Sequence, residues 1–176
     1  MIPATDGKSA AEHVLDRLLR YDHEPYDERW LLLDADHYTS GSHLRTFKRV
    51  MQNAANHGVR IAISKPCFEF WLLLHHADPK SIPAVSNAAE TEVALRMALG
   101  SYNKASLIRE HYPPETVCDA FTAAQGLEAG WGQGEIPLAN GSRVYRLWGA
   151  IMQAMSEAQI PEPLRPLFDL ARTSTQ

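Results

Sequence analysis

The chain has 176 residues, of which 45% are hydrophobic, and 17 Lys and Arg residues against 21 Asp and Glu give a formal net charge of −4. This length and composition exclude a disordered polymer, a collagen-like fibre and a small disulfide scaffold. Its two cysteines, Cys67 and Cys118, are far apart and lack a metal-like spacing, which predicts a protein of the reducing cytoplasm. The longest apolar run, 70–74, is far shorter than the ~20 residues of a membrane span, so we expect no membrane partner.

The first half of the chain has the pattern of a βαβ unit. A capping pair, Ser9 and Glu12, opens the first predicted helix. An uninterrupted apolar run after Arg29 predicts a short strand buried on both faces, and β-branched residues after Gly58 predict a second strand. The predicted elements are a helix over 9–21, a strand over 29–33, a helix over 44–57 and a strand over 59–63. Strand, helix and strand in this order predict a parallel pair.

The second half is predicted to be mainly helical. Helical spacing of apolar residues, prolines at a helix start and a closing Gly100 carry this prediction. The predicted helices cover 68–77, 87–99, a segment opening at 113–115, then 144–155 and 164–171, with a glycine-rich loop over 126–141. The predicted fold class is therefore α/β, with a partial parallel sheet in residues 1–85 and a helical region packed on it in residues 86–176.

Positive charge is concentrated in one segment. Between His37 and Phe68 the chain has no Asp or Glu, whereas it carries five Lys and Arg residues there. A basic block of this kind can attract a polyanion even when the whole protein is anionic. We therefore predict that Arg45, Lys48 and Arg49 contact a nucleic-acid backbone; the alternative is an ordinary solvated helix face.

Asp34 and Asp36 follow the first predicted strand. In an extended strand, residues i and i+2 point to the same side, so both carboxylates can converge on one hard cation such as magnesium or manganese. The alternative is that Asp34 ends the strand and Asp36 caps the next turn.

A second polar cluster follows the second predicted strand. Ser64 and Lys65 are predicted to lie in a turn, and Glu69 in the first turn of the next helix, where the helix dipole favours a carboxylate. Because the carboxyl ends of parallel strands share one edge, Glu69 is expected near Asp34 and Asp36. Alternatively, Glu69 is only a capping acid. Cys67 is interpreted as a small buried hydrophobe, since no Cys-His-Asn set accompanies it.

These residues together resemble a known family. They are Leu33-Asp34-Ala35-Asp36, the run Ser64-Lys65-Pro66-Cys67-Phe68-Glu69-Phe70-Trp71 with His75, Tyr102-Asn103-Lys104, and Ser142-Arg143-Val144-Tyr145-Arg146-Leu147. They are similar to the Asp-x-Asp strand, the Ser-Asn-Pro-Cys-Phe-Glu-x-Trp-Leu signature, the Tyr-x-Lys pair and the Ser/Thr-x-Val-x-x-Leu helix of the RloB-like family. The resemblance covers most of residues 8 to 155, and Lys65 stands where the family usually has Asn.

The resemblance implies a Toprim-like α/β fold and a magnesium-dependent nuclease, or nuclease-like subunit, of a prokaryotic anti-phage defence or restriction-linked system. In that reading Asp34 and Asp36 bind Mg or Mn, Glu69 and Lys65 act in catalysis, and Lys104 joins the basic residues that contact DNA or RNA. The first alternative is a catalytically silent nucleic-acid-binding or scaffold protein. A general nucleotide-binding domain is less well supported, because no glycine-rich phosphate loop follows a strand.

The resemblance also implies a Glu-Gly strand upstream. Only 28 residues precede Arg29, and Glu12, Glu24 and Glu28 lie in other contexts, so the chain is expected to begin at the second strand of the fold. A sheet without its first strand exposes an edge that another chain can cover. We therefore expect a homo-oligomer or a partner chain from a defence operon, and weak or no nuclease activity of this chain alone.

Overall fold

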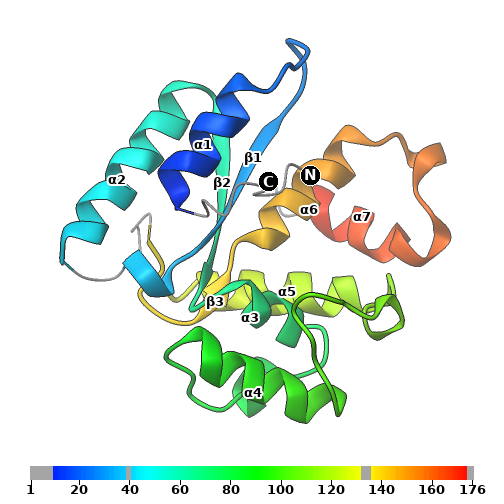
Figure 1. Cartoon of the computed structure of the whole chain (residues 1–176). Helices are drawn as coiled ribbons and strands as arrows, with labels where there is room; N and C mark the ends of the chain where they lie inside the picture. The colour runs from blue at the N-terminus through cyan, green and yellow to red at the C-terminus, as the bar shows by residue number, and fades with distance from the viewer. Residues whose placement is uncertain (1–9, 39–40, 132–135, 174–176) are drawn as a thin grey trace.

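A three-stranded sheet in the order β1-β2-β3 organises the fold (Figure 1). The computed structural model describes residues 10–38, 41–131 and 136–173. β1 (Arg29–Asp34) and β2 (Val59–Lys65) run parallel and in register over six residue pairs, from Arg29 opposite Val59 to Asp34 opposite Ser64. β3 (Gly141–Ser142) adds a short antiparallel strand to the other edge of β2. The predicted parallel pair and the mixed α/β class are confirmed.

Helices account for most of the remaining secondary structure. The α-helices in the described residues are α1 (Ala11–Arg20), α2 (Gly41–Asn56), α3 (Phe68–Leu73), α4 (Ala88–Leu99), α5 (Thr116–Glu128), α6 (Val144–Ala154) and α7 (Arg165–Thr173). Each has a counterpart among the predicted helices. α4 matches closely: the Asn87 side chain accepts a hydrogen bond from the backbone N–H of Glu90, and Gly100 follows with a φ of 76°.

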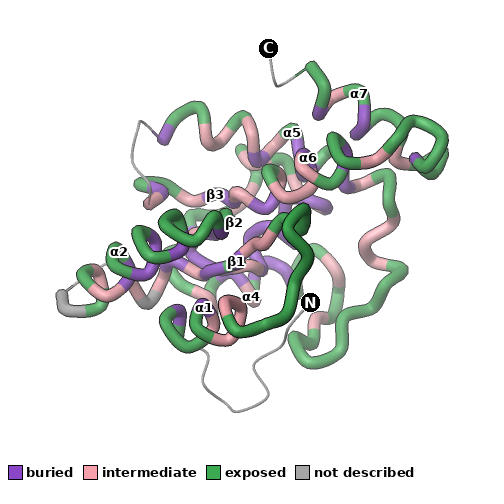
Figure 2. Tube along the Cα trace, turned by 90° about the horizontal axis from the view of Figure 1, so that it is seen from above, coloured by how far each residue is buried: buried purple, intermediate pink, exposed green. Residues whose placement is uncertain are grey.

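The two faces of the sheet are covered differently. α1 and α2 lie together against one face, where Leu15, Leu31, Phe47 and Ile63 form a closed apolar layer (Figure 1). α6 packs against β2 from the other side, and α5 and α7 pack on α6. Viewed from above, buried residues follow β1 and β2 while the outer surfaces of the helices are exposed (Figure 2).

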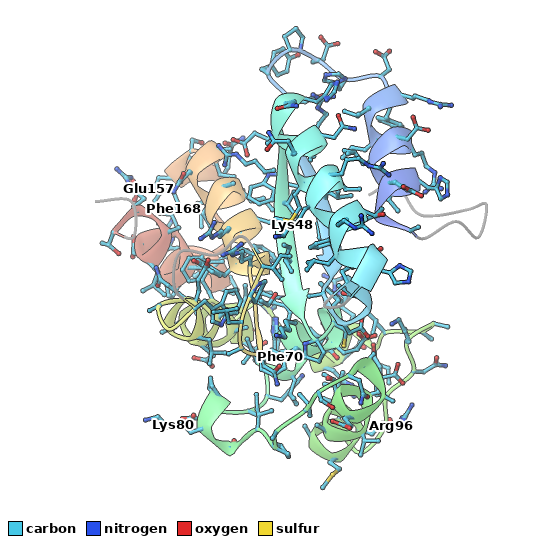
Figure 3. The ribbon with its side chains drawn as sticks, turned by 90° about the vertical axis from the view of Figure 1, so that its left-hand side faces the viewer. Lys48, Phe70, Lys80, Arg96, Glu157 and Phe168 are labelled. Atoms are coloured by element: carbon cyan, nitrogen blue, oxygen red, sulfur yellow. The ribbon has the colours of Figure 1, made fainter. Side chains whose placement is uncertain are left out.

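A second apolar layer lies at the carboxyl ends of the strands. α3 begins there and packs against α4 and α5 through Trp71, Leu95 and Ala120, all buried. Phe70 marks this position at the foot of β2 (Figure 3). The short α3 is therefore surrounded by protein, and any polar side chain on it needs a partner inside the fold.

Three local predictions were wrong. β1 is buried on one face only: Leu31 and Leu33 are buried, but Leu32 is 38% exposed, because α6 lies over β2 and leaves this part of β1 partly open. Ser64 and Lys65 lie inside β2 rather than in a turn, since β3 pairs with these two residues. The helix predicted over 68–77 ends at Leu73.

Some predicted features lie partly outside the residues that the structure describes. Ser9 of the predicted capping pair lies outside the described residues; α1 starts at Ala11, after Ala10, without a side-chain cap. Part of the predicted loop over 126–141 is also outside them, and its first residues belong to α5. The division at residue 85 stays a prediction. Within the described residues, no helix is long and apolar enough to cross a membrane.

Candidate carboxylate site at the ends of the strands

Asp34, the last residue of β1, is tied to the start of α3. Its Oδ1 accepts a hydrogen bond from the backbone N–H of Phe68 at 2.8 Å. The backbone N–H of Ala35 donates to the carbonyl of Ser64 at 2.9 Å, and that of Asp36 to the carbonyl of Pro66 at 3.0 Å. These bonds hold the carboxyl ends of both strands together, so Asp34 lies beside the residue that follows Phe68, which is Glu69.

The environment of Asp34 disfavours its charge. Burial raises the pKa of the Asp34 carboxyl to about 6, and the nearby charges of Glu69 and Asp36 add to the rise. The Phe68 N–H and the Lys104 ammonium act in the opposite direction but do not outweigh burial. Asp34 is therefore an acid that changes its protonation close to neutral pH, and a nearby cation would favour its ionised form.

Glu69 is the most deeply buried acid of the site, with 1% of its surface exposed. Its Oε1 lies 2.8 Å from Lys104 Nζ and accepts a hydrogen bond from the Tyr102 hydroxyl at 3.2 Å. Its Oε2 is buried and receives no hydrogen bond from an N–H or O–H group of the described residues. The loop after α4 thus supplies the counter-ion for a carboxylate on α3, and its cation lies on the Oε1 side.

Lys104 decides the ionisation of Glu69. Burial acts to raise the pKa of Glu69, but the hydrogen bonds from Lys104 and Cys67 outweigh it and the net pKa is lowered. The same contact raises the pKa of Lys104, and burial beside this carboxylate raises the pKa of the Cys67 thiol to about 12. Glu69 is therefore ionised at neutral pH, and Cys67 is a thiol rather than a nucleophilic thiolate.

Asp36 does not continue the strand. β1 ends at Asp34, and Asp36 opens a short 3-10 turn, Asp36–Tyr38. The extended geometry assumed for an i, i+2 pair is therefore absent. Asp36 still lies close enough for its charge to raise the pKa of Asp34, so the two acids share one electrostatic environment.

The chain matches one protein-family model. A family model described as RloB-like protein matches residues 2–151, which include all four stretches noted in the sequence. The chain belongs to the RloB-like family. No curated protein and no solved structure matches this RloB-like chain.

The oxygen ligands of this RloB-like site suit a hard cation. Asp34, Asp36 and Glu69 offer carboxylate oxygens; burial first, and then the charges of Glu69 and Asp36, raise the pKa of Asp34. No group of three or more His, Cys, Asp or Glu side chains with metal-binding geometry occurs in the part of the chain that the structure describes. Magnesium needs only one or two protein carboxylates together with water and substrate oxygens, so the donor set fits this ion.

The predicted basic residues lie in three places. Arg45, Lys48 and Arg49 are exposed on α2, and Lys48 is seen on that helix in front of the sheet (Figure 3). Arg49 pairs with Glu12 at 3.3 Å. Lys65 donates to the carbonyls of Pro137 and Leu138, at 3.2 and 2.9 Å, and so holds the loop before β3. Lys104 is the cation that the structure brings to the carboxylates.

Tyr102 and Cys67 were not predicted as site residues. Tyr102 donates to Glu69, and the Cys67 thiol contributes to holding the Glu69 pKa down. The Tyr-x-Lys spacing could have indicated Tyr102 as a site residue, because residues two apart in an extended loop can reach one acceptor together. Sequence alone did not indicate that this acceptor is Glu69, which lies 33 residues before Tyr102.

Proposed function

We propose that this RloB-like chain is a magnesium-dependent Toprim-type nuclease, or a nuclease-like subunit, of a prokaryotic anti-phage defence or restriction-linked system. The single observation that carries the proposal is the gathering of Asp34, Asp36, Glu69 and Lys104 at the carboxyl ends of two parallel strands. This edge of a parallel sheet is where ligands of α/β folds bind.

Each residue has a role in this proposal. Asp34 and Asp36 would hold Mg or Mn, with Glu69 supporting them through its second oxygen. When bound, the ion supplies a Lewis acid for a phosphodiester oxygen. Lys104, with 62% of its side chain exposed, neutralises Glu69 and presents a positive charge beside the acids. Lys65, predicted to act in catalysis, would contact a phosphate only after releasing the two carbonyls that it binds.

The nucleic acid, DNA or RNA, would run along α2. Arg45 and Lys48 are exposed and have no ion pair with the described residues, whereas Arg49 shares its charge with Glu12. Both cysteines are free thiols, which supports a reducing, cytoplasmic setting. The alternative is a catalytically silent nucleic-acid-binding or scaffold protein; the Lys104–Glu69 pair favours it, because an internal counter-ion neutralises the charge of Glu69 without a metal.

The test is thermal melting with and without divalent cations. At a cation concentration about 100-fold above Kd, the stabilisation is about 2.7 kcal/mol, which raises Tm by about 5–10 °C for a domain of this size. We expect this rise with Mg or Mn and its loss in Asp34→Asn and Asp36→Asn. Asp169→Asn, an exposed acid of α7, is the control that should keep the rise.

The same preparation distinguishes the alternative. An unchanged melting curve with both cations refutes the metal site. In that case, binding of labelled DNA or RNA that weakens in the double variant Arg45→Gln and Lys48→Gln supports the nucleic-acid-binding alternative. Magnesium-dependent cleavage that survives Asp34→Asn combined with Asp36→Asn refutes the residue assignment.

A further inference from the structure

A cleft of about 500 Å³ lies on the side of the sheet away from α1 and α2. Its walls are Trp30 of β1 with Arg60 and Ile61 of β2 on one side, and α5, α6 and α7 on the other. Leu32 is on the same face of β1 as Trp30 and is 38% exposed, so the helices leave this face partly open. The volume is within the range of small-molecule sites in proteins.

The sheet wall of the cleft combines an aromatic ring and a cation. The guanidinium carbon of Arg60 lies 5.5 Å from the centre of the Trp30 ring. Glu28 holds both side chains: it accepts a hydrogen bond from Trp30 Nε1 at 3.2 Å and pairs with Arg60 Nη2 at 3.2 Å. Arg60 is 56% exposed, and a guanidinium has five N–H donors, so most of its donors remain for a ligand.

The helical wall supplies a second guanidinium. Arg146 of α6 donates to Glu128 through Nε at 3.1 Å and through Nη2 at 2.5 Å, and it is 49% exposed. Glu128 also pairs with Arg143 at 2.7 Å and accepts from the Tyr145 hydroxyl. Glu128, which also binds Arg143 and Tyr145, thus fixes Arg146 at the wall of the cleft. The N–H groups of Arg146 that do not bind Glu128 suit a phosphate.

We propose that this cleft binds a nucleoside monophosphate unit, either as a free nucleotide or at the end of a nucleic-acid strand. The base packs against Trp30, because an indole offers a stacking surface to any base, and Arg60 and Arg146 bind the phosphate. Gln125 and Gln153 of the helical wall line the remainder. No glycine-rich loop is required, since guanidinium groups replace backbone amides as the phosphate donors.

This site is separate from the carboxylate site. Trp30 and Arg60 are the second residues of their strands, whereas Asp34 is four residues further along β1, about 13 Å at the rise of a strand. The inference therefore does not rest on metal binding. It needs an assay without divalent cations.

Calorimetric titration with AMP in the presence of EDTA is the primary test. Saturable binding is expected, with a Kd between about 0.1 and 1 mM. Inorganic phosphate alone and adenosine alone should each bind at least about tenfold more weakly, because the first lacks the base and the second lacks the phosphate. Asp34→Asn should bind AMP as the unchanged protein does, so a failed metal site leaves this result intact.

Two matched pairs of variants locate the site. Arg60→Gln should weaken AMP binding about fivefold to tenfold, whereas Arg96→Gln should leave it unchanged. Arg96 is the fitting control because it is 51% exposed and paired with one glutamate, as Arg60 is, but lies on α4 beyond the carboxyl ends of the strands (Figure 3). Gly149→Leu should abolish binding by filling the cleft, since a Cβ there meets only Phe121, at 3.8 Å; Gly126→Leu, in open space on α5, should not.

Titration with a short oligonucleotide, with and without a 5′-phosphate, distinguishes a free nucleotide from a strand end as the ligand. Binding of AMP alone assigns a free nucleotide, and binding of the phosphorylated strand assigns a strand end; both support the site. No saturable binding of AMP or of the strand overturns it. Equal loss in Arg60→Gln and Arg96→Gln, or unchanged binding in a folded Gly149→Leu protein, also overturns it.

Discussion

At the scale of single residues, the ionised form of Asp34 lowers the stability of the folded protein. Its ionised form is disfavoured by burial and by the charges of Glu69 and Asp36. Its Oδ1 nevertheless accepts a hydrogen bond from the Phe68 N–H at the start of α3. An asparagine keeps the acceptor and removes the charge. An ionised carboxylate at this position is therefore more costly to the fold than an asparagine would be.

We predict that Asp34→Asn stabilises the metal-free protein above pH 6. The unfolded carboxyl ionises near 3.8 and the folded one near 6, so the folded state binds more protons in between and the free energy of unfolding falls as pH rises through this window. The gain should be on the order of 1–2 kcal/mol after allowance for solvent screening. Urea unfolding at about pH 8 and pH 5 measures it, and an equal loss at both pH values would contradict it.

His75 acts in the opposite direction over a similar range. It is 8% exposed, its Nδ1 lies 2.9 Å from Thr116 Oγ1, and it packs edge-on against Trp71 and Tyr112. Burial, with a smaller contribution from His76, lowers the pKa of His75 to about 4. The imidazole is therefore neutral in the folded protein down to moderately acidic pH.

We predict that His75→Asn reduces the acid sensitivity of the fold. Unfolded His75 takes up a proton near pH 6.5 and folded His75 near 4, so its stabilisation is complete above 6.5 and is lost as pH falls towards 4. Asn retains a polar atom near Thr116 and does not titrate. The slope of the free energy of unfolding between these pH values should decrease, by up to about one proton. The unchanged protein, measured in the same buffers, is the reference for this slope.

At the scale of elements, β3 depends on one close approach. A Cβ atom placed on Gly141 would lie 2.0 Å from Cζ2 of Trp131, whose side chain is 1% exposed. Any residue with a Cβ at this position would force β3 and Trp131 apart. Its neighbour Ser142 is also buried and shares a hydrogen bond with Ser64 at 2.8 Å.

We predict that Gly141→Ala destabilises the protein by about 1–3 kcal/mol, because a buried indole has no room to move. Gly126→Ala is the control: it lies in α5 with nothing within 4 Å of an added Cβ, so it should stabilise by up to about 1 kcal/mol. Denaturant unfolding of both variants measures the difference. A neutral Gly141→Ala would show that β3 is not packed as described.

At the scale of the whole molecule, the outer edge of β1 is not paired with another strand in the described residues. Met97 and Leu138 are also exposed, at 78% and 79%. Unpaired edges and exposed apolar side chains favour association. We predict that the protein forms a homodimer or larger assembly, which light scattering coupled to gel filtration measures; a monomeric mass at working concentration would contradict it.

Local patterns determined the elements of this protein. The apolar run after Arg29 and the β-branched run after Gly58 predicted two parallel strands, and the spacing of apolar residues predicted α2, α4 and α6 within a few residues. These features depend on neighbours in the chain, and side-chain periodicity reports them directly. The acidic residues that follow the strands were likewise predicted to meet, because parallel strands end at one edge.

Only the tertiary structure decided which residues complete each site. The 3-10 turn at Asp36, the exposed Leu32 and the pairing of Lys104 with Glu69 depend on what packs against them from distant parts of the chain. Lys65 and Lys104 were both predicted as functional cations, yet Lys65 binds loop carbonyls and Lys104 binds a buried carboxylate. Burial and distance set the energy of a charge, and both are fixed by packing across the fold rather than by spacing along the chain.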